Sequence, residues 1–187
     1  MGLMAKTKSG NTERKLIPEG VHIAVCDLVC DLGLQEGFEG GDAKHQAYIR
    51  WQLPNERIQW EKDGVDTEGP MVIGGFYTIS THPKSKMRPM LESWLDRDIS
   101  PDEEENGFDL FELIELPASL YVKHKKMPDG SMRALLLDVS PYNGKKEVKV
   151  EGLPITHEGL NTETLELLPE WLQKKVNNQI MPDEIPI

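Results

Sequence analysis

Apolar and polar residues alternate with the two-residue period of a β-strand in five stretches of this chain. The stretches are residues 21–32, 43–53, 71–80, 118–126 and 132–140, and residues 57–62 are a candidate extension of the second. The first is apolar enough to be buried on most of both faces. In the third, Gly74 and Gly75 predict a bulge or a sharp bend. Pro128, Asp129 and Gly130 predict a turn that joins the last two strands as a hairpin.

Apolar residues recur at helical spacing in residues 85–95, which predicts a short helix that plugs one end of the sheet. A further helical turn is expected at residues 108–113, whereas the acidic stretch 96–106 is expected to be a solvated loop. Residues 163–176 predict one amphipathic helix, although Pro169 would kink or delay it. We therefore expect a mainly β protein, a five-stranded OB-fold barrel with a helix between strands 3 and 4 and a C-terminal helix and tail.

The chain of 187 residues has a formal charge of -11, which argues against a surface covered all over with phosphate-binding cations. Its acids are concentrated in residues 96–115 and 151–187, so the core can still offer a cationic groove. We predict three regions. They are a flexible basic arm at residues 1–15, an OB-fold nucleic-acid-binding domain at residues 16–143, and a C-terminal extension at residues 144–187 with a helix and an acidic partner-recruiting tip.

The last five residues join two carboxylates to an apolar, proline-stiffened end: Asp183, Glu184, Ile185, Pro186 and Ile187. This tip resembles that of bacterial and phage single-stranded-DNA-binding proteins, which typically ends Asp-Asp-Ile-Pro-Phe, and it departs from that pattern at Ile187. Four further stretches resemble small phage-encoded proteins of this kind. They are residues 18–20, 84–95, 116–126 and 140–142.

The resemblance implies a protein that coats single-stranded DNA during phage replication or recombination, in the cytoplasm of the bacterial host. It also implies that the tip recruits replication or recombination enzymes, with Ile187 in an apolar pocket and the carboxylates on a basic rim. Coating needs copies side by side, and the helix at residues 163–176 is a candidate for self-association into a homo-oligomer. No apolar run approaches membrane-spanning length, so no membrane partner is expected.

Binding single strands without reading their sequence needs cations for the phosphates and aromatic faces for the bases. We predict that Tyr48 and Arg50 face outward together on the second strand, and that Tyr121, Lys123 and Lys125 do so on the fourth. The full predicted DNA-binding set is Lys44, Tyr48, Arg50, Trp60, Tyr77, Lys84, Lys86, Arg88, Tyr121, Lys123, Lys125, Lys126 and Arg133.

Each of these positions has a plainer interpretation. Tyr48 and Arg50 could form an ordinary polar strand face, and the lysines of the fourth strand could protect a solvated edge strand from aggregation. The cations at residues 84–88 could be the exposed first turn of a helix. Trp51 and Trp94 are expected to be buried in the core, because large aromatic side chains usually are.

The sequence does not predict catalysis. The acidic run at residues 102–105 is typical of a solvated surface rather than of a two-metal site, and no histidine has a nucleophile or acid at a telling spacing. Cys26 and Cys30 should share one strand face roughly 13 Å apart, too far for a disulfide. We expect no enzymatic activity, metal or cofactor. The alternative function is an acidic OB-fold adaptor or nucleic-acid mimic that binds a host protein, which the overall charge supports.

Overall fold

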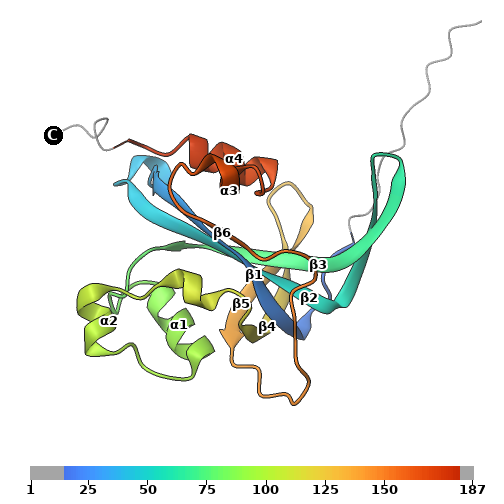
Figure 1. Ribbon diagram of the computed structural model, residues 1–187, viewed down its shortest axis with the longest axis horizontal. Coiled ribbons are helices and arrows are strands. Elements are labelled where there is room, and N and C mark those ends of the chain that lie inside the picture. Colours follow the sequence, from blue (N-terminus) through green and yellow to red (C-terminus); the bar gives the residue numbers. More distant parts are fainter. Residues whose placement is uncertain (1–14, 182–187) are drawn as a thin grey trace, which may run out of the picture.

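The computed structural model describes residues 15–181 and shows a mainly β protein with a few short helices (Figure 1). The strands are β1 (Gly20–Gln35), β2 (Lys44–Lys62), β3 (Val65–Thr78), β4 (Pro117–Lys126), β5 (Met132–Ser140) and β6 (Ile155–His157). The helices are η1 (Phe38–Gly40), α1 (Met87–Leu95), α2 (Pro101–Asn106), η2 (Leu110–Leu113), α3 (Thr162–Leu165) and α4 (Glu170–Asn177). The five predicted strands, the hairpin of β4 and β5, and the helix between the third and fourth strands are all confirmed.

Five strands form a strongly curled antiparallel half-barrel in the order β3-β2-β1-β4-β5. The central strand β1 pairs with β4 through its first residues, Gly20 to Val25, and with β6 in parallel through Leu28 to Cys30. Its register against β2 shifts between Cys26 and Leu28, which marks a β-bulge. Such a bulge bends a strand and increases its twist. The part of β1 before the bulge can therefore pair with β4, while the part after it pairs with β6.

The inner side of the curl holds the larger hydrophobic core. Ile49 and Trp51 of β2 are completely buried there against α1. Leu91 and Trp94 of α1 pack into the same core, on the inner side of the curled sheet. The indole Nε1 of Trp94 donates a hydrogen bond of 2.8 Å to the carbonyl oxygen of Pro117. The expected burial of both tryptophans and the expected position of the helix are therefore confirmed.

The outer side of β1 and β2 is covered by the C-terminal segment, which runs back over the sheet opposite to α1 and α2 (Figure 1). A second core forms there. Its buried members are Leu28, Cys30, Leu32, Tyr48, Leu168, Leu172 and Val176. The single helix expected at residues 163–176 is instead two, because Pro169 separates α3 from α4. With apolar cores on both sides, β1 is buried on most of both faces, as its composition predicts.

One local expectation is wrong, one is wrong in part, and one strand was not predicted. Residues 96–106 are not all loop, because the side chain of Ser100 accepts a hydrogen bond from the amide of Glu103 and caps the helix α2. The predicted bulge is absent at Gly74 and Gly75, which lie in continuous register with β2, while a bend there stays a prediction. The irregularity of this ladder falls between Leu53 and Arg57, opposite Met71 and Pro70. The strand β6 has no counterpart among the predicted elements, since three residues carry no detectable period.

The two cysteines do not share a face. Cys26 lies in the inner core and Cys30 in the outer one, because the bulge between them reverses the alternation of β1. Both are buried free thiols, as expected for two cysteines too far apart to be bridged. Within residues 15–181, no helix is both long and apolar enough to cross a membrane. The predicted basic arm, apart from Lys15, and the predicted tip at residues 183–187 lie outside the described residues.

Candidate nucleic-acid interface

The outer face of β4 and β5 carries the predicted row of Tyr121, Lys123 and Lys125. Leu120 and Val122, which alternate with them, are completely buried, so the predicted orientation of this strand is confirmed. The ammonium of Lys123 lies 5.9 Å from the centroid of the Tyr121 ring. This face therefore presents a half-exposed aromatic ring beside exposed cations.

The hairpin extends the same face across to β5. Lys125 stands directly opposite Arg133 on this face, whereas Lys126, opposite Met132, points to the other face of the hairpin. Like charges directly opposite one another on adjacent strands are destabilising. No carboxylate of the described residues lies within ion-pair distance of Lys123, Lys125, Lys126 or Arg133. Acids also border this end of the sheet: Asp138 pairs with Tyr121 in the ladder, and Glu19 and Asp129 lie near enough to Lys123 and Arg133, respectively, to interact with them electrostatically without forming an ion pair. The four cations outnumber these three acids, so this end of the sheet is still suited to bind anions.

Tyr48 and Arg50 do share a face of β2, but that face is covered at Tyr48 and open only at Arg50, which lines a recess of about 690 Å³. Tyr48 is only 8% exposed, because the ring of Trp171 from α4 packs edge-on against it at 5.0 Å. Burial raises the pKa of its hydroxyl. Arg50 forms an ion pair with the buried Asp27. The expectation of an open face is wrong for Tyr48, because α4 covers it, whereas Arg50 faces the recess but is held by Asp27.

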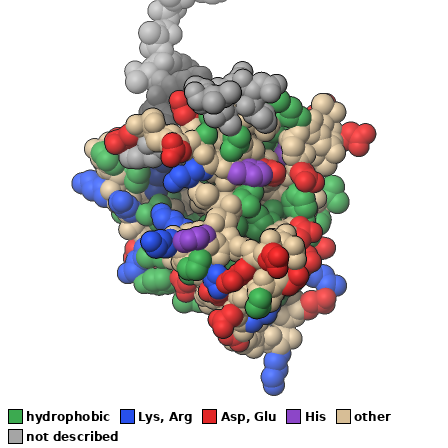
Figure 2. Space-filling model, turned by 90° about the vertical axis from the view of Figure 1, so that its left-hand side faces the viewer, with side chains coloured by type: hydrophobic (Ala, Val, Ile, Leu, Met, Phe, Trp, Pro, Cys, Tyr) green, Lys and Arg blue, Asp and Glu red, His purple; other side chains and the backbone are tan. Residues whose placement is uncertain are grey.

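The cations before and within α1 differ in their surroundings. Lys84 and Lys86 are exposed, and neither has an ion-pair partner among the described residues. Arg88 is instead held by two carboxylates, those of Glu92 and Glu104. Figure 2 views the side that carries α1 and α2, and it shows side chains of both signs interspersed on that surface. Lys44, at the start of β2, is also exposed, and within residues 15–181 it has no ion pair.

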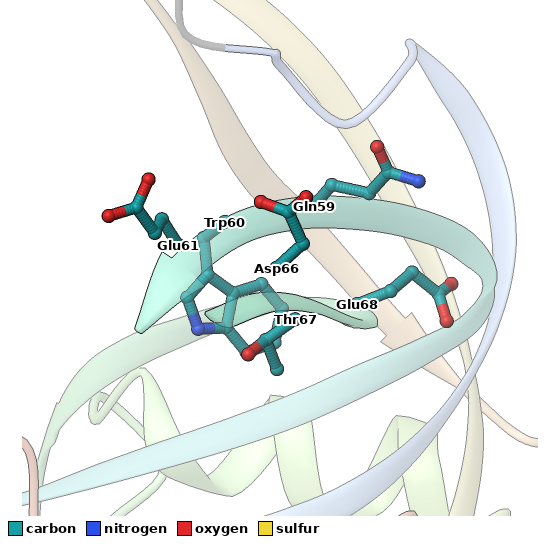
Figure 3. A pocket seen from close by; sticks show the side chains of 6 residues that line it. All are labelled: Gln59, Trp60, Glu61, Asp66, Thr67 and Glu68. Atoms are coloured by element: carbon teal, nitrogen blue, oxygen red, sulfur yellow. The ribbon is translucent and has the colours of Figure 1, made fainter. Parts of the chain in front are cut away.

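Trp60 and Tyr77 lie apart from the β4–β5 face. Trp60 is 43% exposed on the long β2–β3 hairpin and lines a recess of about 350 Å³ together with Glu61, Asp66 and Glu68 (Figure 3). Glu68 is paired with Arg57, but Glu61 and Asp66 have no ion pair among the described residues, and two such carboxylates beside one ring disfavour a phosphate backbone. Tyr77 packs against the inner core, where burial raises the pKa of its hydroxyl to about 12.

Two aromatic residues that the sequence analysis did not select are exposed on the outer side. Phe76 of β3 is 46% exposed and Trp171 of α4 is 44% exposed, with ring centroids 6.1 Å apart. The sequence did carry a signal for Trp171, because it lies beside rather than on the apolar stripe that contains Leu168 and Leu172. Its ring therefore packs on Tyr48 and still stays 44% exposed.

The structure thus brings together Tyr121, Lys123, Lys125 and Arg133 and separates them from Trp60 and Tyr77. Among residues 15–181, no group of three or more His, Cys, Asp or Glu side chains is arranged to hold a metal ion. A comparison with models of known protein families gives no match, and a comparison with curated proteins finds no relative of this chain.

Proposed function

We propose that this protein binds single-stranded DNA without reading its sequence, and that its half-barrel is an OB-fold. The support for the fold is the strand order β3-β2-β1-β4-β5, the strong curl and the helix α1 between β3 and β4. OB-folds use the face of strands 2 and 3 and the adjoining loops to bind oligonucleotides. The role in phage replication or recombination, and recruitment of enzymes through residues 183–187, rest on the resemblance of the sequence.

The observation that carries the proposal is the row of unpaired cations beside Tyr121. Edge protection would be the plainer role for lysines in this position. However, β4 is flanked by β1 as far as Val122 and by β5 along most of its length. Beyond Val122, the carboxylate of Glu19 already accepts a hydrogen bond of 2.7 Å from the amide of His124. The facing positions of Lys125 and Arg133 are therefore explained better by a ligand that carries phosphates than by edge protection.

A polarisation titration with fluorescent oligo-dT at increasing salt tests this function. The logarithm of the affinity should fall linearly with the logarithm of the salt concentration, with a slope of about -0.7 for each phosphate contacted. A duplex of equal length should bind more weakly, because its bases are not free to stack. Absence of binding, or an affinity that does not respond to salt, would contradict the proposal.

A protein-binding adaptor is the second candidate, and the acidic recess around Trp60 favours it. An electrophoretic shift with labelled single-stranded DNA separates the two. Binding that persists or strengthens when the chain ends at Met181 supports the DNA function, and absence of a shift in both forms supports the adaptor. The chain is shortened after Met181 and not further upstream. Shortening it after Val150, for example, would also remove α4, which covers buried residues of β1.

A further inference from the structure

Three aromatic rings from three different elements meet on the outer side of the sheet. The ring of Tyr48 in β2 lies 4.9 Å from that of Phe76 in β3 and 5.0 Å from that of Trp171 in α4. Tyr48 is buried beneath the other two, which both stay more than two fifths exposed. The two exposed rings are therefore supported from below rather than loose on the surface.

The backbone of β3 is adapted to this cluster. A Cβ atom at Gly74 would lie 2.3 Å from the hydroxyl oxygen of Tyr48, so only glycine lets the phenol lie across the strand. Val72, the next outward residue of β3 after Gly74, is 45% exposed and continues the apolar surface from Phe76 toward the β2–β3 hairpin. The exposed surface thus runs along β3, in the direction that an extended strand would follow.

Cations border the rings. The ammonium of Lys175 lies 5.2 Å from the centroid of the Phe76 ring, and Lys174 precedes it on α4. Neither lysine has a carboxylate within ion-pair distance among the described residues. Exposed rings with unpaired cations beside them are the features that hold the bases and the phosphates of single strands. An apolar contact with a second copy would not explain the unpaired charge.

We propose that α4 completes a base-stacking site on the outer face of β3. An unpaired base stacks on Trp171 beside Phe76, whose ring is inclined at 71° to that of Trp171, and Lys175 contacts the phosphate. The site rests on the proposed function and adds to it a second contact region, separate from the β4–β5 face. It gives the C-terminal extension a direct part in binding. The extension supplies one of the two rings and the cation, and it also buries Tyr48 beneath them.

Tryptophan fluorescence tests the site directly. Trp51 and Trp94 are 0% and 3% exposed, so Trp60 and Trp171 are the tryptophans that a base can reach. Titration of the full chain with dT15 should quench the emission, and most of this quenching should be lost in Trp171→Phe. Trp171→Ala should weaken binding by about 5- to 150-fold, the range for loss of one stacked base. Lys175→Ala should reduce the salt slope by about 0.7.

Matched variants separate stacking from loss of structure. Leu160→Ala removes a similarly exposed apolar side chain of the extension, and Lys145→Ala removes an exposed lysine near its start. Both variants should bind as the unaltered chain does. An oligonucleotide with 5-iododeoxyuridine should cross-link to peptides that contain Phe76 or Trp171.

The outcomes distinguish this site from the general function. Failure of the unaltered chain to bind dT15 overturns the proposed function and the site with it. Binding that is equal in Trp171→Ala, with cross-links confined to the β4–β5 hairpin, overturns the stacking site alone. A loss of self-association in Trp171→Ala without a change in DNA affinity would identify the rings as a contact between copies and would also overturn the site.

Discussion

The guanidinium of Arg50 donates two hydrogen bonds to the carboxylate of Asp27, from Nε to Oδ1 at 3.0 Å and from Nη2 to Oδ2 at 2.8 Å. Asp27 is 2% exposed, and the side-chain amide of Gln52 donates a further hydrogen bond of 3.1 Å to it. Gln52 also exchanges two hydrogen bonds with the backbone of Glu151. The ion pair thus belongs to a network that attaches the C-terminal segment to the sheet.

Arg50→Ala should therefore lower the free energy of unfolding by about 3–5 kcal/mol, because it leaves the carboxylate of Asp27 buried without its counter-ion. Urea denaturation followed by tryptophan fluorescence measures this loss. Lys44→Ala removes a cation from the same strand at an exposed position and should change the stability by less than about 0.5 kcal/mol. Equal and small effects of both changes would show that Arg50 is a surface cation after all.

Gly74→Ala should destabilise the fold by about 1–3 kcal/mol, the usual cost of forcing an extra carbon into a packed site. The added methyl group would lie 2.3 Å from the Tyr48 hydroxyl oxygen and 2.7 Å from the Ile49 carbonyl oxygen, and the latter belongs to the backbone and cannot rotate away. Gly75→Ala is the control, since its nearest neighbour is a ring carbon of Tyr77 at 3.0 Å. The thermal midpoint of Gly74→Ala should be clearly the lower of the two.

The strands could be predicted because their alternation is local. The orientation of Tyr121 and Lys123 follows from the buried residues between them, and the structure confirms it. The alternation of Tyr48 and Arg50 is equally clear, yet it says nothing of what covers that face. The cover comes from α4, more than a hundred residues later in the chain. Exposure at this site depends on a distant contact that no local pattern contains.

The errors have identifiable physical causes. The bulge in β1 places Cys26 and Cys30 on opposite faces, and a bulge changes the face of every later residue without changing composition. The capping box that begins at Ser100 was visible in the sequence, but the acids after it suggested a solvated loop. The strand β6 is stabilised by its parallel pairing with β1 rather than by its own three residues.

Glu103→Gln should lower the thermal midpoint at neutral pH. Hydrogen bonds from Arg97 and then from the amide of Ser100 lower the pKa of Glu103 from its ordinary value of 4.5 to about 2. A carboxylate with a lowered pKa stabilises the fold above its ordinary pKa, and this contribution is lost as the pH falls through the folded value. The difference between the two proteins should therefore be full at pH 6 and should close between pH 4.5 and about 2.

Calorimetric scans between pH 2 and 7 measure this difference. Glu105→Gln is the matched control, because Glu105 is an exposed acid of the same helix without an ion pair among the described residues. Its midpoint should follow that of the unaltered chain throughout. A deficit in Glu103→Gln that persists unchanged at pH 2 would mean that the amide disturbs α2 by a route other than charge.

Replacement of Lys125 and Arg133 together by Ala should weaken DNA binding without weakening the fold. If each cation contacts one phosphate, the salt slope for oligo-dT should become shallower by about 1.4, since each contact on a single strand contributes about 0.7. Stability should stay equal or rise slightly, because the change removes two like charges that face each other across β4 and β5. Weaker DNA binding together with equal or higher stability would show that the two cations bind DNA rather than stabilise the hairpin. A fall in the thermal midpoint with an unchanged salt slope would assign the two cations to the hairpin itself, and the β4–β5 face would lose its place in the proposed interface.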